Sequence, residues 1–261
     1  MQEKTKFKIV SSKKTRYILP NILTLIGVCL GISSIKFSID QNYSMAVVFV
    51  LFAALLDALD GRVARLIKGT SEFGKELDSL TDFVSFGIAP AFIIYFWELN
   101  KYGKIGWAIT LIYSVCCVLR LARFNLTEYS EKDSWKNNYF EGVPSPAGGI
   151  LILLPLIFEL SEFNYNVKII VPYITIIIAF LLISKIPTFS LKKISIPPKF
   201  TIFILFGFGV IFVSLMFFTF QALFLLGLIY FLSVPVSFFM FKIHQKRIKD
   251  IQQEEEHEDV L

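Results

Sequence analysis

Four aspartates carry the clearest chemical signal in the sequence, because they form two closely spaced pairs. Asp57 and Asp60 are three residues apart, and Asp78 and Asp82 are four residues apart. Both spacings place a pair on one face of a helix. The connection between the two helices, residues 66–73, is short, so we expect a hairpin on which the two acidic faces meet. Carboxylates that converge in this way are ligands for hard divalent cations.

The depth of the aspartates makes a counter-charge necessary. At about 1.5 Å per helical residue from the expected membrane boundary, Asp57 lies about 14 Å inside, and Asp60 and Asp82 lie about 9 and 10 Å inside. An unpaired intramembrane aspartate costs at least about 2.5–3.5 kcal/mol. Arg62 and Arg65 are too few and too close to the surface to neutralise four carboxylates. We therefore expect a pair of divalent ions, which recurs in phosphoryl chemistry with a separation of about 3.5–4 Å.

Small residues between the aspartates leave room for a ligand. Gly61 and Ala64 share the acidic face of the first helix, and Gly74 faces them across the hairpin. A nucleotide or a phosphate can therefore approach the backbone closely. The alternative is that the aspartates are ion-paired surface groups at a helix–loop boundary. That alternative suits a single aspartate, but not four at this depth with glycines between them.

The elements that must position these residues are membrane-spanning helices. Hydrophobic residues make up 55% of the 261-residue chain, and they form runs long enough to cross the hydrocarbon layer, which takes about 20 helical residues. We expect an all-α integral membrane protein, a polytopic bundle of about eight transmembrane helices. Six or seven spans remain open, because the fifth run is short and only a break near 219–221 separates the last two. The expected helices cover residues 18–38, 44–67, 75–97, 105–123, 146–161, 167–184, 200–218 and 221–241.

Basic residues between the apolar runs predict the orientation. With both termini in the cytoplasm, 22 of the 26 Lys and Arg residues fall in cytoplasmic segments, as the positive-inside rule requires. We therefore expect a protein of the cell (inner, cytoplasmic) membrane whose aspartates face the cytoplasm. No basic stripe is interleaved with aromatic residues outside the apolar runs, so no nucleic-acid partner is expected. The expected division is a basic cytoplasmic segment 1–17, a membrane domain 18–199, two additional transmembrane helices in 200–241 and a charged cytoplasmic tail 242–261.

The acidic segment also carries a family resemblance. It matches the pattern D-x2-D-G-x2-A-R-x8-G-x3-D-x3-D at all eight fixed positions, and it therefore resembles the CDP-alcohol phosphotransferases. The matching residues are Asp57, Asp60, Gly61, Ala64, Arg65, Gly74, Asp78 and Asp82. The resemblance implies that residues 18–199 are the membrane domain of this family.

The resemblance implies a role for each matched position. Asp57, Asp60 and Asp78 would hold one metal ion, and Asp78 and Asp82 would help to hold a second. Asp82 would also act as the general base on the acceptor alcohol. Both Mg²⁺ and Mn²⁺ are hard enough for an all-carboxylate site, so the identity of the metal stays open. The residues implied to bind CDP are Asp57, Gly61, Ala64, Arg65, Gly74 and Asp78, with Arg65 near the phosphates.

Four flanking segments resemble the phosphatidylserine synthase branch of this family. They are FVSFGIAPA directly after Asp82, CVLRLARFN at 117–125, FEGVPSPAGG at 140–149 and LISKIPTFSLK at 182–192. The resemblance implies CDP-diacylglycerol and L-serine as substrates, and phosphatidylserine and CMP as products. It also implies that the protein works in the lipid bilayer as a homodimer.

The acceptor site needs a cation beside the metals, because serine carries a carboxylate. Arg120 and Arg123 lie at the cytoplasmic end of the fourth expected helix, and Asn125 follows them. These three residues are candidates for binding either serine or the lipid-linked phosphate. The alternative is that both arginines only anchor the helix on the cytoplasmic side.

Three other functions remain open at this stage. Within the same family, the acceptor can be another alcohol, such as glycerol 3-phosphate, inositol phosphate or choline. An ion-coupled transporter also places carboxylates in the membrane, but it predicts deep charges in several helices and inverted repeats. A member that has lost activity and acts only as a scaffold is disfavoured by the complete acidic set.

Overall fold

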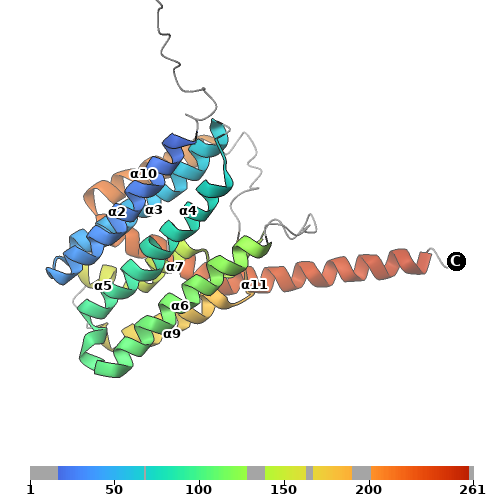
Figure 1. Ribbon diagram of the computed structural model, residues 1–261. Coiled ribbons are helices and arrows are strands. Elements are labelled where there is room, and N and C mark those ends of the chain that lie inside the picture. Colours follow the sequence, from blue (N-terminus) through green and yellow to red (C-terminus); the bar gives the residue numbers. More distant parts are fainter. Residues whose placement is uncertain (1–16, 68, 128–138, 163–166, 190–200, 259–261) are drawn as a thin grey trace, which may run out of the picture.

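The structure is a computed structural model that describes residues 17–67, 69–127, 139–162, 167–189 and 201–258 (Figure 1). Within these ranges the chain is helical apart from one two-stranded sheet, which confirms the all-α prediction. Five helical stretches of the described chain are long and apolar enough to cross a membrane. They are Ile18–Ile39, Tyr43–Leu66, Glu72–Trp97, Leu99–Leu126 and Thr219–Ile243.

The first two spans, α2 (Ile18–Ile39) and α3 (Tyr43–Leu66), pack along each other as a hairpin. Asn42 is the N-cap of α3, and its side-chain oxygen accepts a hydrogen bond of 3.2 Å from a backbone N–H of the first turn, which has no partner within the helix. Small residues on α2 allow close approach to the third span. A Cβ at Gly31 would lie 2.8 Å from Ser85 Oγ, so glycine is required for this packing.

The third span changes its helical geometry directly after Asp82. It consists of α4 (Glu72–Asp82), the π-helix η1 (Phe83–Ile88) and α5 (Ala89–Trp97). Pro90 has no N–H to donate to the Phe86 carbonyl one turn earlier. The Tyr113 hydroxyl donates to that carbonyl instead, at 2.9 Å. The π-helix therefore lies where proline interrupts the regular ladder, and a side chain from another helix restores the missing bond.

The middle of the chain packs against the third span. Its elements are η2 (Leu99–Tyr102), α6 (Gly103–Thr127), β1 (Tyr139–Glu141), α7 (Ser145–Ile152), α8 (Leu154–Leu160), η4 (Lys168–Ile170), α9 (Val171–Ile183) and β2 (Pro187–Phe189). Helix α6 packs along α9, and α7 contacts both η1 and α9. Strands β1 and β2 pair antiparallel, with Phe140 opposite Thr188. The sheet thus joins the two segments that flank α7 and α9.

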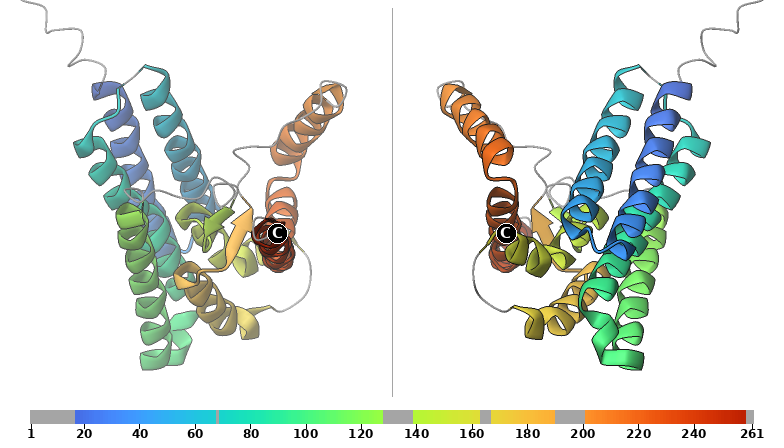
Figure 2. Two further views of the ribbon diagram at one scale, coloured as in Figure 1. Left: turned by 90° about the vertical axis from the view of Figure 1, so that its right-hand side faces the viewer. Right: turned by 90° about the vertical axis from the view of Figure 1, so that its left-hand side faces the viewer.

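The last two helices extend away from this assembly. Helix α10 (Thr201–Phe217) is followed by α11 (Thr219–Glu258), a single helix of 40 residues that contains Pro235. Figure 1 shows the C-terminal half of α11 projecting beyond the other helices. Figure 2 shows α10 standing apart from α2, α3 and α4. Near its start, however, α11 packs against α8 and β2.

The count of eight spans is not confirmed. The expected fifth helix is divided into α7 and α8, because Pro155 cannot donate to the carbonyl one turn earlier. The expected sixth helix is a shorter apolar stretch, Lys168–Ile183, and α10 has only 17 residues. The expected eighth helix continues past residue 241 as α11. The cytoplasmic placement of both termini stays a prediction.

The core and the outer surface are both apolar, as expected for a protein surrounded by lipid. Fully buried side chains include Phe86, Ile93, Tyr113, Leu151 and Ile178, contributed by the third span, α6, α7 and α9. Large apolar side chains are exposed on α2, α3, α6, α10 and α11. An exposed apolar surface of this extent is typical of a membrane-facing protein.

Candidate active site

The structure brings together the aspartates that the sequence places on two helices. Asp57 and Asp60 lie in the last turns of α3, and Asp78 lies on α4. One carboxylate oxygen from each of these three residues lies within 4.8 Å of the other two. Three oxygens this close could hold a metal ion, and carboxylates suit a hard divalent cation. The cluster therefore fits the metal expected from the sequence.

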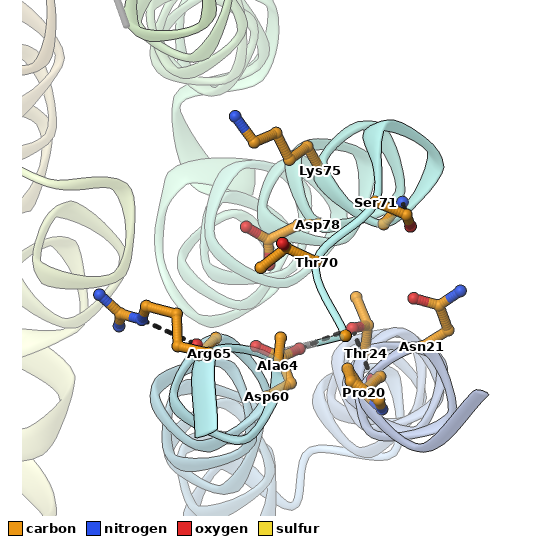
Figure 3. A pocket seen from close by; sticks show the side chains of 13 residues that line it. Pro20, Asn21, Thr24, Asp60, Ala64, Arg65, Thr70, Ser71, Lys75 and Asp78 are labelled. Carbon is orange, nitrogen blue, oxygen red and sulfur yellow. Dashed lines mark hydrogen bonds between the residues drawn. The ribbon is translucent and has the colours of Figure 1, made fainter. Parts of the chain in front are cut away.

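The most buried of the three carboxylates has a partner that the sequence analysis missed. Asp60 is 4% exposed, and its Oδ2 accepts a hydrogen bond of 2.7 Å from Thr24 Oγ1 on α2. Figure 3 shows Thr24 facing Asp60 across the gap between the two helices. A hydroxyl that donates to a ligating carboxylate fixes the orientation of that carboxylate. Helix α2 thus contributes to the acidic cluster although it carries none of the four aspartates.

Asp82 occupies a different environment from the other three aspartates. It is the last residue of α4 and lies adjacent to the Asp57 carboxyl. On its other side, Asp82 Oδ2 accepts a hydrogen bond of 2.7 Å from Ser145 Oγ, at the start of α7. Ser145 Oγ in turn accepts a hydrogen bond of 2.8 Å from Arg120 Nη1 on α6. Asp82 therefore connects the acidic cluster with a buried cation.

A cavity of about 260 Å³ opens on the α2 side of the acidic cluster (Figure 3). The residues expected to bind CDP lie in its wall, except Asp57. No atom lies within 4 Å of the position that a Cβ would occupy at Gly61, so the room expected at this glycine is present. The lining residues are Pro20, Asn21, Thr24, Asp60, Gly61, Ala64, Arg65, Gly69, Thr70, Ser71, Gly74, Lys75 and Asp78.

The Arg65 side chain reaches back along its own helix. Its Nε donates a hydrogen bond of 2.9 Å to the Gly61 carbonyl. Figure 3 shows the guanidinium pointing away from Asp60. The residue is exposed at the mouth of the cavity.

The three residues considered for serine or lipid phosphate do not lie in one group. Arg120 is buried beside Ser145, whereas Arg123 donates to the carbonyls of Leu182 and Ser184 at the end of α9. Such donors satisfy carbonyls that a helix C-terminus leaves without partners. The Asn125 side chain exchanges hydrogen bonds with Ser79 on α4, at 3.1 and 3.3 Å. In this arrangement Arg123 and Asn125 hold helices together, and only Arg120 faces Asp82.

Comparison with known proteins identifies the family. The family model described as CDP-alcohol phosphatidyltransferase matches residues 17–183. The chain belongs to this family. All eight motif positions lie within the match, and α10 and α11 lie outside it.

Several curated relatives resemble the chain over most of the family region. The chain is 37% identical over 186 residues to a CDP-diacylglycerol–serine O-phosphatidyltransferase of Mycobacterium tuberculosis, covering 70% of this chain and 65% of the relative. The same name is carried by a Helicobacter pylori protein, 33% identical over 201 residues, which are 76% of this chain and 82% of that protein. An archaetidylserine synthase of Methanothermobacter thermautotrophicus is 36% identical over 180 residues, covering 67% of this chain and 71% of the relative. The chain therefore spans just under two thirds of the length of the mycobacterial relative.

Proposed function

We propose that the protein transfers the phosphatidyl group of CDP-diacylglycerol to the hydroxyl of L-serine, giving phosphatidylserine and CMP. The observation that carries this proposal is the convergence of the family aspartates beside a cavity in a membrane-spanning chain. Serine as the acceptor is supported by the relatives, since both the bacterial and the archaeal names contain it. The pocket is proposed to face the cytoplasm, in line with the distribution of basic residues.

The acidic cluster is proposed to hold the divalent metal, Mg²⁺ or Mn²⁺. Asp57, Asp60 and Asp78 offer three hard oxygen ligands within 4.8 Å, and Asp82 lies beside Asp57 where it can help to hold a second ion. The metal would neutralise the phosphates of the donor and stabilise the leaving CMP. The cavity wall formed by Gly61, Ala64, Arg65 and Gly74 would receive the CDP moiety.

Asp82 is proposed as the general base. In the transfer, the serine hydroxyl oxygen forms a bond with the lipid-side phosphorus, and the phosphoanhydride bond to CMP breaks. The hydroxyl proton passes to the Asp82 carboxylate, and CMP leaves with the bonding electrons. The hydrogen bond from Ser145 fixes Oδ2 of Asp82, while Oδ1, with the Asp57 carboxyl near it, accepts no hydrogen bond from a donor group of the described chain. That second oxygen is available to accept the proton.

The proposal is tested with purified protein in lipid vesicles or detergent. CMP release is measured with CDP-diacylglycerol and, in parallel, with serine, glycerol 3-phosphate, inositol phosphate or choline. We expect release with serine, loss of release on chelation of divalent metal, and recovery with Mg²⁺ or Mn²⁺. CMP release with another alcohol but not with serine would overturn the assignment of serine as the acceptor. No release with any alcohol, together with ion-driven uptake of a solute, would favour a transporter.

The role of Asp82 is tested by the variant Asp82→Asn, which keeps the shape of the side chain and removes its basicity. We expect kcat to fall by about 10²- to 10⁴-fold. The matched control is Asp40→Asn on the loop between α2 and α3, where an exposed aspartate pairs with Lys36. The control should retain full activity. Undiminished transfer by Asp82→Asn would refute the assignment of the base.

The homodimer implied by the family resemblance stays a prediction. Cross-linking in membranes, followed by measurement of the mass of the product, would test it.

A further inference from the structure

A buried cation lies on the opposite side of Asp82 from the acidic cluster. Arg120 is 8% exposed, and its guanidinium donates to Ser145 through Nη1. Its Nε is buried and has no hydrogen-bond partner in the described part of the chain, where Arg120 also forms no salt bridge. A buried arginine is costly unless an anion and hydrogen-bond acceptors complete its environment. Asp82, reached through Ser145, and the ring of Phe124 at 5.8 Å both lie near the guanidinium, but within the described residues the Nε–H is left without an acceptor, which points to a ligand that carries an acceptor group.

A second buried group without a hydrogen-bond partner in the described residues, a tyrosine hydroxyl on α11, lies near this cation. The Tyr230 hydroxyl is buried and makes no hydrogen bond within the described residues. It lies beside the Thr188 hydroxyl on β2 and within electrostatic range of Arg120. The Thr188 hydroxyl already donates to the Gly142 carbonyl, at 2.8 Å. Toward Tyr230 the Thr188 oxygen can therefore act only as an acceptor, and because no hydrogen bond between the two is formed within the described residues, the Tyr230 O–H remains free to donate to a ligand.

The position of Tyr230 is fixed by the packing of α11. Gly227, one turn earlier, lies so close to α8 that a Cβ there would be 2.4 Å from Leu154 Cδ2. Val234 and Ser237, on the same side of α11, are also buried. Helix α11 therefore packs its Gly227–Tyr230 face against the family domain, although it lies outside the family match.

The geometry of phosphoryl transfer favours an acceptor at this position. The attacking and leaving oxygens lie roughly in line on opposite sides of phosphorus. The cavity proposed for CDP is lined by residues of α2, α3, α4 and the α3–α4 connection. Asp82 contacts Ser145 on α7, which is not among the lining residues of that cavity. An alcohol that approaches Asp82 opposite CMP therefore arrives beside Arg120.

We propose that Arg120 and Tyr230 form the acceptor subsite, in which both side chains bind the carboxylate of an amino-acid alcohol while its hydroxyl lies at Asp82. The inference rests on the proposed function and adds the residue from α11 that selects the acceptor. The carboxylate supplies an acceptor for the Arg120 Nε–H, and it accepts the hydrogen bond that the Tyr230 hydroxyl does not make within the described residues. An alcohol without an anionic group would leave both donors without partners.

The experiment compares Tyr230→Phe with Tyr173→Phe. The first variant removes only the hydroxyl, and the second does the same to a tyrosine on α9 that is 65% exposed. We expect Tyr230→Phe to raise KM for serine about tenfold, because it removes one hydrogen bond to a charged group. Its kcat and its KM for CDP-diacylglycerol should stay within about twofold of wild type. Tyr173→Phe should change none of the three constants.

Other outcomes separate this inference from the proposed function. Unchanged constants in Tyr230→Phe would overturn the subsite. A rise in KM for CDP-diacylglycerol alone would assign the anion to the donor phosphate and would also overturn it. If the wild type uses a different alcohol, the proposed function fails. The subsite would then survive only if that alcohol carries an anionic group and its KM rises in Tyr230→Phe.

Discussion

Ser145 offers the most direct test of how the site is organised, because one hydroxyl connects Asp82 with Arg120. Its oxygen donates to Asp82 at 2.7 Å and accepts from Arg120 at 2.8 Å. The residue is 1% exposed, so water does not readily replace it. The variant Ser145→Ala removes both hydrogen bonds. It should not disturb the backbone of α7, because alanine is compatible with a helix.

The expected effect of Ser145→Ala on kcat follows from the two hydrogen bonds that it removes. Each is a hydrogen bond to a charged group, worth about 1.5–3 kcal/mol, so their sum is about 3–6 kcal/mol at most. The net loss is smaller, because Arg120 can move toward Asp82 once the hydroxyl is gone. We expect the activation free energy of the transfer to rise by about 2 kcal/mol, because Asp82 is no longer held in one orientation. This corresponds to a fall in kcat of about 30-fold.

The assay is CMP release at saturating serine and CDP-diacylglycerol, with thermal unfolding measured in parallel. The control is Ser33→Ala on α2, whose exposed hydroxyl bonds only to the Cys29 carbonyl. The control should retain full kcat. A kcat within twofold of wild type for a folded Ser145→Ala variant would refute the positioning role. A change confined to KM for serine would instead assign Ser145 to the acceptor subsite.

Two further variants distinguish residues that support the acidic cluster from residues that only hold helices together. Thr24→Val removes the hydroxyl that donates to Asp60, and we expect the Mn²⁺ concentration for half-maximal CMP release to rise about tenfold or more, since loss of such partners weakens metal sites by about 10- to 100-fold. An unchanged metal requirement would contradict the role of Thr24. Arg123→Gln removes the donors at the end of α9, and we expect a loss of about 1–2 kcal/mol in thermal or denaturant unfolding with unchanged KM for serine. A raised KM with unchanged stability would return Arg123 to the substrate site.

The acidic cluster was predictable because its signal is local. Two pairs at helical spacing, joined by a short connection, leave few ways for Asp57, Asp60 and Asp78 to avoid one another. Their roles as ligands stay predictions, but their convergence is present in the structure. The glycine at position 61 was informative for the same reason, since the absence of a side chain beside two acids can be read directly from the sequence.

The partners of these acids were not predictable from spacing. Thr24 is 36 residues from Asp60, and Ser145 is 63 residues from Asp82. Thr24 lies in an apolar run, where a hydroxyl on a membrane helix often bonds to its own backbone. Ser145 lies in the segment FEGVPSPAGG between two prolines, a pattern typical of a helix start, and nothing in its spacing marks it as a partner of Asp82. Only the packing of α2 and α7 against the third span reveals what these hydroxyls bind.

The number of spans is not confirmed, for a related reason. Hydropathy measures how apolar a run is, but it does not show where the backbone breaks. Pro155 divides one expected helix into α7 and α8, whereas Pro235 lies within the continuous α11. The difference comes from what surrounds each proline, because packing decides whether a lost backbone hydrogen bond ends a helix or is tolerated within it.

The contrast between Asp82 and the other aspartates limits what each can do. Asp57, Asp60 and Asp78 each have a carboxylate oxygen within 4.8 Å of the other two, an arrangement that a bound cation would stabilise. Asp82 instead has Ser145 and Arg120 on one side and Asp57 on the other. We predict that a carboxylate between a metal-binding acidic cluster and a buried cation accepts a proton from an alcohol that the cation also holds. We therefore predict that four residues of one type take two roles, and that the helices outside the motif determine which aspartate takes which.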